Sequence, residues 1–371
     1  MTHYVKKDKI VLINFEEENK MNQYLENLNP NIKEYFKILS PEGIPRFLWD
    51  YINTKEMQKQ NGISVSCGTI YSKIYNQIWY SSLDHSIAVA LIVWNFTKDK
   101  KQTLAGLFHD IATPAFKHTV DFMNGDYEKQ ESTEELTADI IKNSKEIMKL
   151  LKKEGIKLEE VKDYHIYPIA DNDTPKLAAD RLEYTLSNGL GATEKIWDLD
   201  EVKKIYQNIE VQKNEEKIQE LGFKDKEIAE KFVHTMSKLS CLYRRSETKY
   251  SMQFLADTIK EMSNNNLITI NDLYTLSEKE VIERIQNCKY GNISKCFKIW
   301  KNATEVVQSD EKVENKYCVS IDNVKIRYIN PLVRNKNGFT RINKISEKAD
   351  NDIKKALNFK TKKYTYLNSV F

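Results

Sequence analysis

Three stretches of this chain carry the side chains best suited to chemistry: His85, the adjacent pair His109 and Asp110, and Asp180. Each lies in a stretch whose pattern predicts helix. Imidazole nitrogens and carboxylate oxygens together suit a divalent metal ion of borderline or hard character. Successive residues on a helix point in directions roughly 100° apart. An adjacent His and Asp therefore act together most easily at a helix end or around a buried metal ion.

The residues around the His-Asp pair favour a helix end. A helical spacing places four apolar residues on one face: Leu104, Leu107, Phe108 and Ile111. Pro114 follows soon after and cannot continue a helix. His109 and Asp110 are therefore expected in the last turn.

His85 and Asp180 both have apolar neighbours in the sequence. His85 belongs to the largely apolar run 83–94, where burying an unpaired imidazole would cost free energy. Asp180 follows three small or apolar residues, 177–179, and a buried carboxylate likewise needs a partner. Binding to a metal ion would satisfy both groups.

Two longer motifs extend this pattern and resemble a known family. The order His, His-Asp, Asp resembles the HD superfamily of metal-dependent phosphohydrolases. Residues 109–121, His-Asp-Ile-Ala-Thr-Pro-Ala-Phe-Lys-His-Thr-Val-Asp, look like the extended motif of its deoxynucleoside triphosphate triphosphohydrolase branch. Residues 180–184, Asp-Arg-Leu-Glu-Tyr, look like that branch's Asp-basic-x-x-Tyr element. The likeness runs from about Ser64 to about Asp257, and residues 325–332 are similar to a C-terminal strand element of some members.

The resemblance implies one divalent metal ion held by His85, His109, Asp110 and Asp180. The sequence does not distinguish Mn, Mg, Fe, Co, Ni and Zn. A bound divalent ion lowers the pKa of its water from about 15.7 towards ~7 and polarises a phosphoryl oxygen.

Further residues of the motifs receive roles through the same resemblance. His118 and Asp121 lie on the catalytic side of the implied pocket, where His118 would deliver a proton and Asp121 would orient its ring. Arg181 and Tyr184 would touch the substrate phosphates. A basic helix further along resembles a second half of the pocket and adds Lys238, Arg245 and Tyr250.

The chain also departs from the triphosphohydrolase pattern. Ser82 stands where these enzymes usually carry an Arg, and Thr113 stands where they place a His. The family also opens the next helix with a His-Glu pair, and this chain has Lys129 and Gln130 at about that place. Lys129 would restore a positive charge near the phosphates, but an ammonium cannot perform the proton transfer of a neutral imidazole.

Each of these residues also has a purely structural interpretation. His118 could be a surface histidine after the Pro-containing turn, and Arg181 a solvated charge. His165, in an irregular stretch, is more typical of a structural loop histidine. The basic cluster around His234, Lys238 and Arg245 could be a solvated helix face.

Composition indicates an intracellular, mainly helical protein. Of the 371 residues 40% are hydrophobic, which suffices for a substantial core, and only 11 Gly and 7 Pro occur. The five Cys include no Cys-x-x-Cys spacing, so reduced thiols are expected. No apolar run reaches ~18 residues and none resembles a signal peptide. We expect a cytoplasmic protein without a membrane span.

The pattern changes along the chain predict three regions. Residues 1–60 form a helical arm packing on the core, 61–260 the HD-type helical metal domain, and 261–371 a small α+β part. Charged residues from 208 to 230 indicate a solvated helix pair. Alternation in 317–321 and 324–329 about Asp322 and Asn323 predicts a β-hairpin.

The C-terminal region is strongly basic. Residues 311–371 hold 14 Lys or Arg and 6 Asp or Glu, a net charge of +8, while the whole chain carries +3. This asymmetry suits an anionic partner such as nucleic acid, and an exposed charged tail is the structural alternative.

Three functional hypotheses follow from the sequence. The leading one is a metal-dependent phosphohydrolase that cuts deoxynucleoside triphosphates to nucleoside and triphosphate. The second keeps the metal site but changes the substrate to a nucleotide monophosphate, a signalling nucleotide or a nucleic-acid end. The third is a nucleotide-sensing regulatory module. The family resemblance also implies a homo-oligomer with a nucleotide activator.

Overall fold

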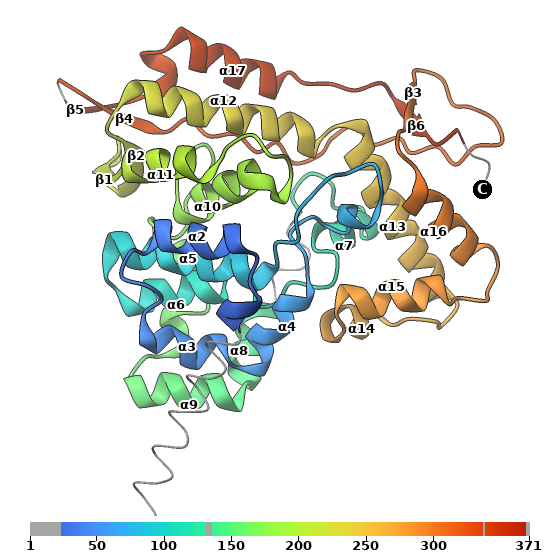
Figure 1. Ribbon diagram of the computed structural model, residues 1–371, viewed down its shortest axis with the longest axis horizontal. Helices are drawn as coiled ribbons and strands as arrows, with labels where there is room; N and C mark the ends of the chain where they lie inside the picture. Colours follow the sequence, from blue (N-terminus) through green and yellow to red (C-terminus); the bar gives the residue numbers. More distant parts are fainter. Residues whose placement is uncertain (1–23, 131–135, 337, 369–371) are drawn as a thin grey trace, which may run out of the picture.

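The computed structural model describes residues 24–130, 136–336 and 338–368. Helices dominate, and a few short strands gather in the second half of the chain (Figure 1). The helices of the first half are α2 (Pro30–Leu39), α3 (Arg46–Ile52), α4 (Lys55–Lys59), α5 (Ser82–Thr97), α6 (Lys100–Phe108), α7 (His118–Met123), α8 (Thr137–Asn143), α9 (Lys145–Glu154) and α10 (Ala179–Ser187). Those of the second half are α11 (Leu199–Gln207), α12 (Lys226–Tyr243), α13 (Ser246–Asn264), α14 (Ile270–Thr275), α15 (Glu278–Gln286), α16 (Ile293–Asn302) and α17 (Glu347–Leu357). The strands are β1 (Ile209–Lys213), β2 (Gln219–Phe223), β3 (Val307–Ser309), β4 (Leu332–Asn335), β5 (Gly338–Arg341) and β6 (Tyr364–Tyr366).

Helix α5 is the central element of the first half. It begins in a capping box, in which the Ser81 hydroxyl accepts from the Asp84 N–H and the Asp84 carboxylate accepts from the Ser81 N–H. Every residue from Ser82 to Val93 is buried, so the helix is covered on all sides. It packs most extensively on α6 and also contacts α10. Residues at its first turn are therefore held rigidly against both neighbours.

Apolar side chains form two clusters. The first surrounds α5 and includes Tyr35 from α2 and Leu182 from α10. The second joins α13 to α16 through Phe254 and Trp300, and it also takes in Phe116, just before α7. The segment between α6 and α7 therefore crosses from one cluster to the other. Figure 1 shows α14, α15 and α16 on the side of the molecule away from α3, α6 and α9.

The larger sheet has four strands in the order β1-β2-β4-β5. β1 and β2 form an antiparallel hairpin, with Val211 opposite Leu221, and β2 pairs in parallel with β4. The helix pair predicted for residues 208–230 is therefore wrong for 209–223. Ile209 and Val211 alternate with polar residues, a period-two pattern that the surrounding Lys and Glu residues obscure.

The hairpin predicted about Asp322 and Asn323 is also wrong in position. The C-terminal hairpin is formed by β4 and β5, further along the chain. Residues 320–331 contain no strand; Val319 makes one isolated bridge with Thr365. Val319, Ile321 and Val324 bury their side chains in the second cluster instead of pairing with one another.

The terminal regions add to this framework. α2, α3 and α4 place apolar side chains in the first cluster, as expected for the predicted arm; its residues 1–23 lie outside the described ranges. The boundaries proposed at residues 60 and 260 stay predictions. Several C-terminal cations are paired with acidic partners, among them Arg334 with Glu210 and Arg341 with Glu220. Among the described residues, no helix is long and apolar enough to cross a membrane.

Candidate metal centre

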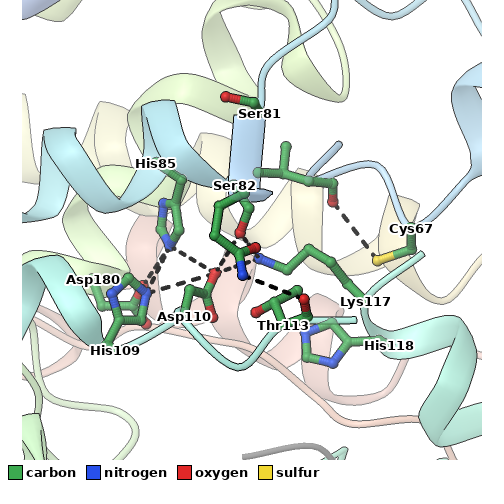
Figure 2. Close-up of polar contacts among 12 residues, drawn as sticks. Cys67, Ser81, Ser82, His85, His109, Asp110, Thr113, Lys117, His118 and Asp180 are labelled. Atoms are coloured by element: carbon green, nitrogen blue, oxygen red, sulfur yellow. Dashed lines mark hydrogen bonds and ion pairs between the residues drawn. The ribbon is translucent and has the colours of Figure 1, made fainter. Parts of the chain in front are cut away.

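Four predicted ligands converge at the junction of α5, α6 and α10 (Figure 2). The Nε2 atoms of His85 and His109 are 3.1 Å apart, and Asp180 Oδ1 lies 3.2 Å from the first and 3.7 Å from the second. Asp110 Oδ2 lies 3.9 Å from His85 Nε2 and 3.8 Å from His109 Nε2. Two imidazoles and two carboxylates thus enclose one small volume.

The ends of two helices position these side chains. α6 ends at Phe108, and the His109 ring turns back to donate from Nδ1 to the Gly106 carbonyl at 2.7 Å, which satisfies a carbonyl at the helix end. Asp180 lies in the first turn of α10, where its side chain faces His85 on α5. The sequence pattern predicts the pair in the last turn of the helix; the structure places it just past the end, with His109 at the C-cap and Asp110 in the following turn.

The hydrogen-bond pattern suits a cation at this place. A carbonyl oxygen only accepts, so His109 Nδ1 carries the proton and its Nε2 presents a lone pair. His85 Nδ1 contacts the buried carboxylate of Glu183, which leaves the Nε2 atom facing that of His109. The His109 Nε2 lone pair and two carboxylates meet at this point, and they are stabilised by positive charge between them, either a proton on His85 Nε2 or a divalent ion. This donor set fits a divalent ion.

The pKa values of His85 and Asp180 also show that positive charge is favoured at this site. Burial alone would lower the pKa of His85, but the carboxylates of Glu183 and Asp180 outweigh it and raise that pKa to about 10. Burial would raise the pKa of Asp180, yet the imidazoles of His85 and His109 hold it below its usual range. Protonated His85 provides positive charge that a bound metal ion would replace.

Glu183 is a site residue that the sequence reasoning missed. It lies one turn after Asp180 on α10 and is fully buried. Besides His85, its carboxylate accepts hydrogen bonds from the hydroxyls of Tyr80, at 2.7 Å, and Tyr35, at 3.2 Å. Its spacing of three from Asp180 was the available signal, because residues at i and i+3 share a helix face.

Lys117 is a second residue that was missed. Its ammonium is 2.5 Å from Asp110 Oδ2 and 3.4 Å from the Ser82 hydroxyl, as Figure 2 shows. Burial would lower the pKa of Lys117, but Asp110 raises it, so the group stays charged. Its backbone has φ 44° and ψ −122°, and that of Phe116 has φ 67°. Backbone conformations of this kind cost of order 1–3 kcal/mol for residues other than glycine and tend to occur at functional sites.

His118 and Asp121 form a hydrogen-bonded pair beside the ligands. His118 Nδ1 is 2.9 Å from Asp121 Oδ2, and its Nε2 is 3.3 Å from an Arg327 nitrogen. A guanidinium only donates, so His118 Nε2 accepts and the Nδ1 proton goes to Asp121. Burial lowers the pKa of His118, Asp121 opposes this, and Arg327 adds to it. His118 is therefore a neutral base in the described state.

A cavity of about 420 Å³ opens over the centre, large enough for a small-molecule ligand. Of the predicted residues, those that line it are His85, His109, Asp110, His118, Asp180, Arg181, Tyr184 and Arg245. Asp121 lies behind His118 and is fully buried. Arg327, Lys325 and Lys117 also line the cavity, so cations reach it from several segments. Arg327 was missed as a site residue, although its segment was noted for its likeness to a family element.

Three predicted substrate residues do not line the cavity. Lys129 is exposed, while its neighbour Gln130 turns inward and accepts from Arg327 at 2.7 Å. Lys238 lies on the exposed face of α12 with its ammonium 2.9 Å from Glu194. Tyr250 is fully buried in the second cluster. Their placement corrects the assignment of these three side chains to the pocket.

Arg181 is neither solvated nor free to move. Its guanidinium lies 3.1 Å from Asp171 and donates to Asn172 at 2.6 Å and to the Lys176 carbonyl at 2.8 Å. These contacts fix the loop 171–176 at the cavity wall. A role for Arg181 in phosphate binding stays a prediction and would compete with them.

His165 and His234 lie nearer the surface. His165 Nδ1 is 2.8 Å from Asp163 and its Nε2 is 3.4 Å from Asp171, at the cavity rim. His234 pairs with Asp352 of α17 at 3.0 Å, away from the cavity. The structure gives both histidines carboxylate partners outside the ligand set.

Comparison with known proteins places the centre inside a recognised domain. Residues 82–184 match the family model of the HD domain. Both histidine ligands, both aspartates and Glu183 fall within that range. The segment from α5 to α10 is therefore similar to HD domains.

Other relatives extend the likeness at lower identity. The uncharacterised protein YdhJ of Bacillus subtilis is 28% identical over 151 residues, which are 40% of this chain and 45% of that protein. The match thus spans less than half of its length. The fold is similar to a hypothetical protein from Aquifex aeolicus (TM-score 0.61, 15% identity, 88% of this chain and 93% of that chain). It is equally similar to a phosphohydrolase from Bacteroides thetaiotaomicron (TM-score 0.61, 14% identity, 88% of this chain and 97% of that chain).

Proposed function

We propose that this protein is a metal-dependent phosphohydrolase that acts on nucleotides. The observation that carries the proposal is the convergence of two imidazole Nε2 atoms and two carboxylates at one end of a cavity with cationic walls. His85, His109, Asp110 and Asp180 would hold a divalent ion. When bound, such an ion supplies a Lewis acid for a phosphoryl oxygen and lowers the pKa of water.

The cavity walls support a phosphorylated substrate. Lys117, Arg245, Lys325 and Arg327 bring positive charge to the lining, which suits phosphate oxygens. The aromatic residues of the lining offer apolar surface for a base or sugar; they are Tyr75, Tyr164, Tyr184 and Tyr243. The volume of about 420 Å³ lies within the range of small-molecule sites. A nucleotide combines both kinds of chemical group.

For the particular substrate we propose a deoxynucleoside triphosphate, on the strength of the motifs at 109–121 and 180–184. Water would add to the α-phosphorus and the bond from that phosphorus to the 5′ oxygen would break, giving triphosphate and nucleoside. His118 lines the cavity, and its unprotonated Nε2 would take a proton from the attacking water and pass it to the departing 5′ oxygen. Asp121 holds the ring by its Nδ1 proton and stabilises the charged imidazolium.

Hydrolysis of nucleotide monophosphates is the second candidate. It is favoured by Ser82 and Thr113, which place neutral side chains where the triphosphohydrolase pattern has an Arg and a His. Neither of these two side chains then offers a charged contact to a long phosphate chain.

The test is product release from a nucleotide panel. Metal-stripped protein, resupplied with Mn, Mg, Co or Ni, is incubated with deoxy- and ribonucleotides while phosphate, pyrophosphate and triphosphate are measured. The His109→Ala, Asp110→Ala double variant is compared with Lys145→Met, a change at an exposed residue of α9. Metal-dependent triphosphate release that the double variant loses is the expected result. Full hydrolysis by the double variant would remove the assignment of the site, and phosphate release from monophosphates alone would favour the second candidate.

A further inference from the structure

The position of the Lys117 side chain is not explained by neutralisation of the Asp110 carboxylate alone. Its side chain is nearly buried yet its ammonium borders the cavity, between Asp110 and the Ser82 hydroxyl. Ser82 Oγ is itself 3.2 Å from Asp110 Oδ2. The Lys117 ammonium thus donates to Asp110 and to the Ser82 hydroxyl, and that hydroxyl in turn donates to Asp110, as Figure 2 shows.

The backbone at Lys117 holds this arrangement against its own preference. Two successive residues, Phe116 and Lys117, have positive φ, and the ψ of −122° at Lys117 is a conformation that glycine adopts readily. The Phe116 ring is fully buried in the second cluster, and its N–H donates to Glu278 Oε1 at 3.2 Å. Conformations of this kind persist only where the surroundings determine them, and they are common at ligand sites.

Charge considerations identify the ligand. A divalent ion held by Asp110 and its neighbours would lie close to the Lys117 ammonium, and the single negative charge of Asp110 would not balance both cations. A phosphate group that binds the ion would place a further oxygen towards the Lys117 ammonium. Ser82 is small enough to leave room for the lysine head group, which reaches this place from a different element of the chain.

We propose that the Lys117 side chain, which lines the cavity next to Asp110, forms a phosphate-binding subsite beside the metal centre. This inference rests on the proposed function, since the phosphate is that of the substrate. Lys117, and not the exposed Lys129, then supplies positive charge at the position of Ser82.

The probe is inorganic phosphate titrated into Mn-loaded protein, followed by paramagnetic relaxation of its ³¹P signal. Lys117→Met removes the charge, and Lys117→Gly removes it while also accommodating the backbone conformation. Lys145→Met on the exposed face of α9 is the matched control. We expect at least a tenfold loss of phosphate affinity in both Lys117 variants, with Mn affinity kept or increased because a neighbouring cation is gone. Lys117→Gly should also unfold at a higher temperature than Lys117→Met.

Two outcomes separate this inference from the proposed function. If wild-type protein hydrolyses nucleotides but both Lys117 variants bind phosphate within twofold of wild type, Lys117 only balances Asp110 and the subsite is rejected. If wild-type protein hydrolyses no nucleotide while phosphate affinity still falls tenfold in both variants, the subsite stands and the hydrolase is rejected.

Discussion

Replacing Glu183 by Gln tests how the metal centre is held in place. Glu183 is fully buried and contacts His85 Nδ1, so its carboxylate fixes the ring that presents Nε2 to the ligand set. Glutamine keeps the size of the side chain but removes the negative charge. The His85 ring would lose its charged acceptor and become a weaker ligand.

The expected loss can be estimated from this contact. Removing the carboxylate partner of a ligating histidine typically costs 10–100-fold in metal affinity. Ten- to a hundredfold corresponds to roughly 1.4–2.7 kcal/mol. Because the Glu183 carboxylate is fully buried and also accepts from Tyr80 and Tyr35, we expect a value near the upper end.

The assay is calorimetric titration of Mn into metal-stripped protein at pH 7.5. Tyr80→Phe is the matched control, since it removes a neutral donor to the same carboxylate but leaves its charge, and it should cost less than tenfold. Thermal unfolding of both variants checks that the fold is kept. Wild-type Mn affinity in a folded Glu183→Gln protein would refute the reasoning.

Four further substitutions address stability and proton transfer. Burial raises the pKa of Glu278 to about 8, so its contribution to stability is complete below its ordinary value of 4.5 and is lost as pH rises through 8. That loss amounts to up to roughly 5 kcal/mol. In the Glu278→Gln variant the unfolding temperature should therefore fall less between pH 5 and 9 than it does in the wild type. Parallel curves of unfolding temperature against pH for the two proteins would contradict this. His118→Ala should lower kcat by ~10²-fold or more. Asp121→Asn should move the His118 limb of the pH profile of kcat/KM to lower pH, because Asp121 stabilises the imidazolium. An unmoved limb would argue against a functional His118–Asp121 pair. Arg341→Met leaves the buried Glu220 carboxylate without its bidentate partner and should cost about 3–5 kcal/mol in urea unfolding, whereas adding Glu220→Leu should restore most of it.

Much of the candidate site could be predicted because its four central residues lie on helices or directly after a helix end, and the sequence patterns of these helices are local. The apolar face before His109 predicts where α6 ends, and the burial of His85 follows from the run 83–94. The structure brings both histidines together with Asp110 and Asp180. Their role as metal ligands stays a prediction that these distances support.

Other features depend on contacts between distant segments and could not be predicted. Lys117 reaches the centre only because Phe116 and Lys117 adopt positive φ, which the neighbouring residue types do not favour. Arg327 meets His118 across 209 positions of the chain. The segment around Asp322 alternates like a hairpin, yet its apolar residues find partners in the second cluster.

The most direct test of the metal centre is anomalous diffraction at the manganese edge from crystals grown with Mn. The account predicts one strong peak within coordination distance of His85, His109, Asp110 and Asp180, and its loss in the Asp180→Asn variant. No peak among these four side chains in the Mn-loaded wild-type protein, or a peak bound elsewhere, would contradict it.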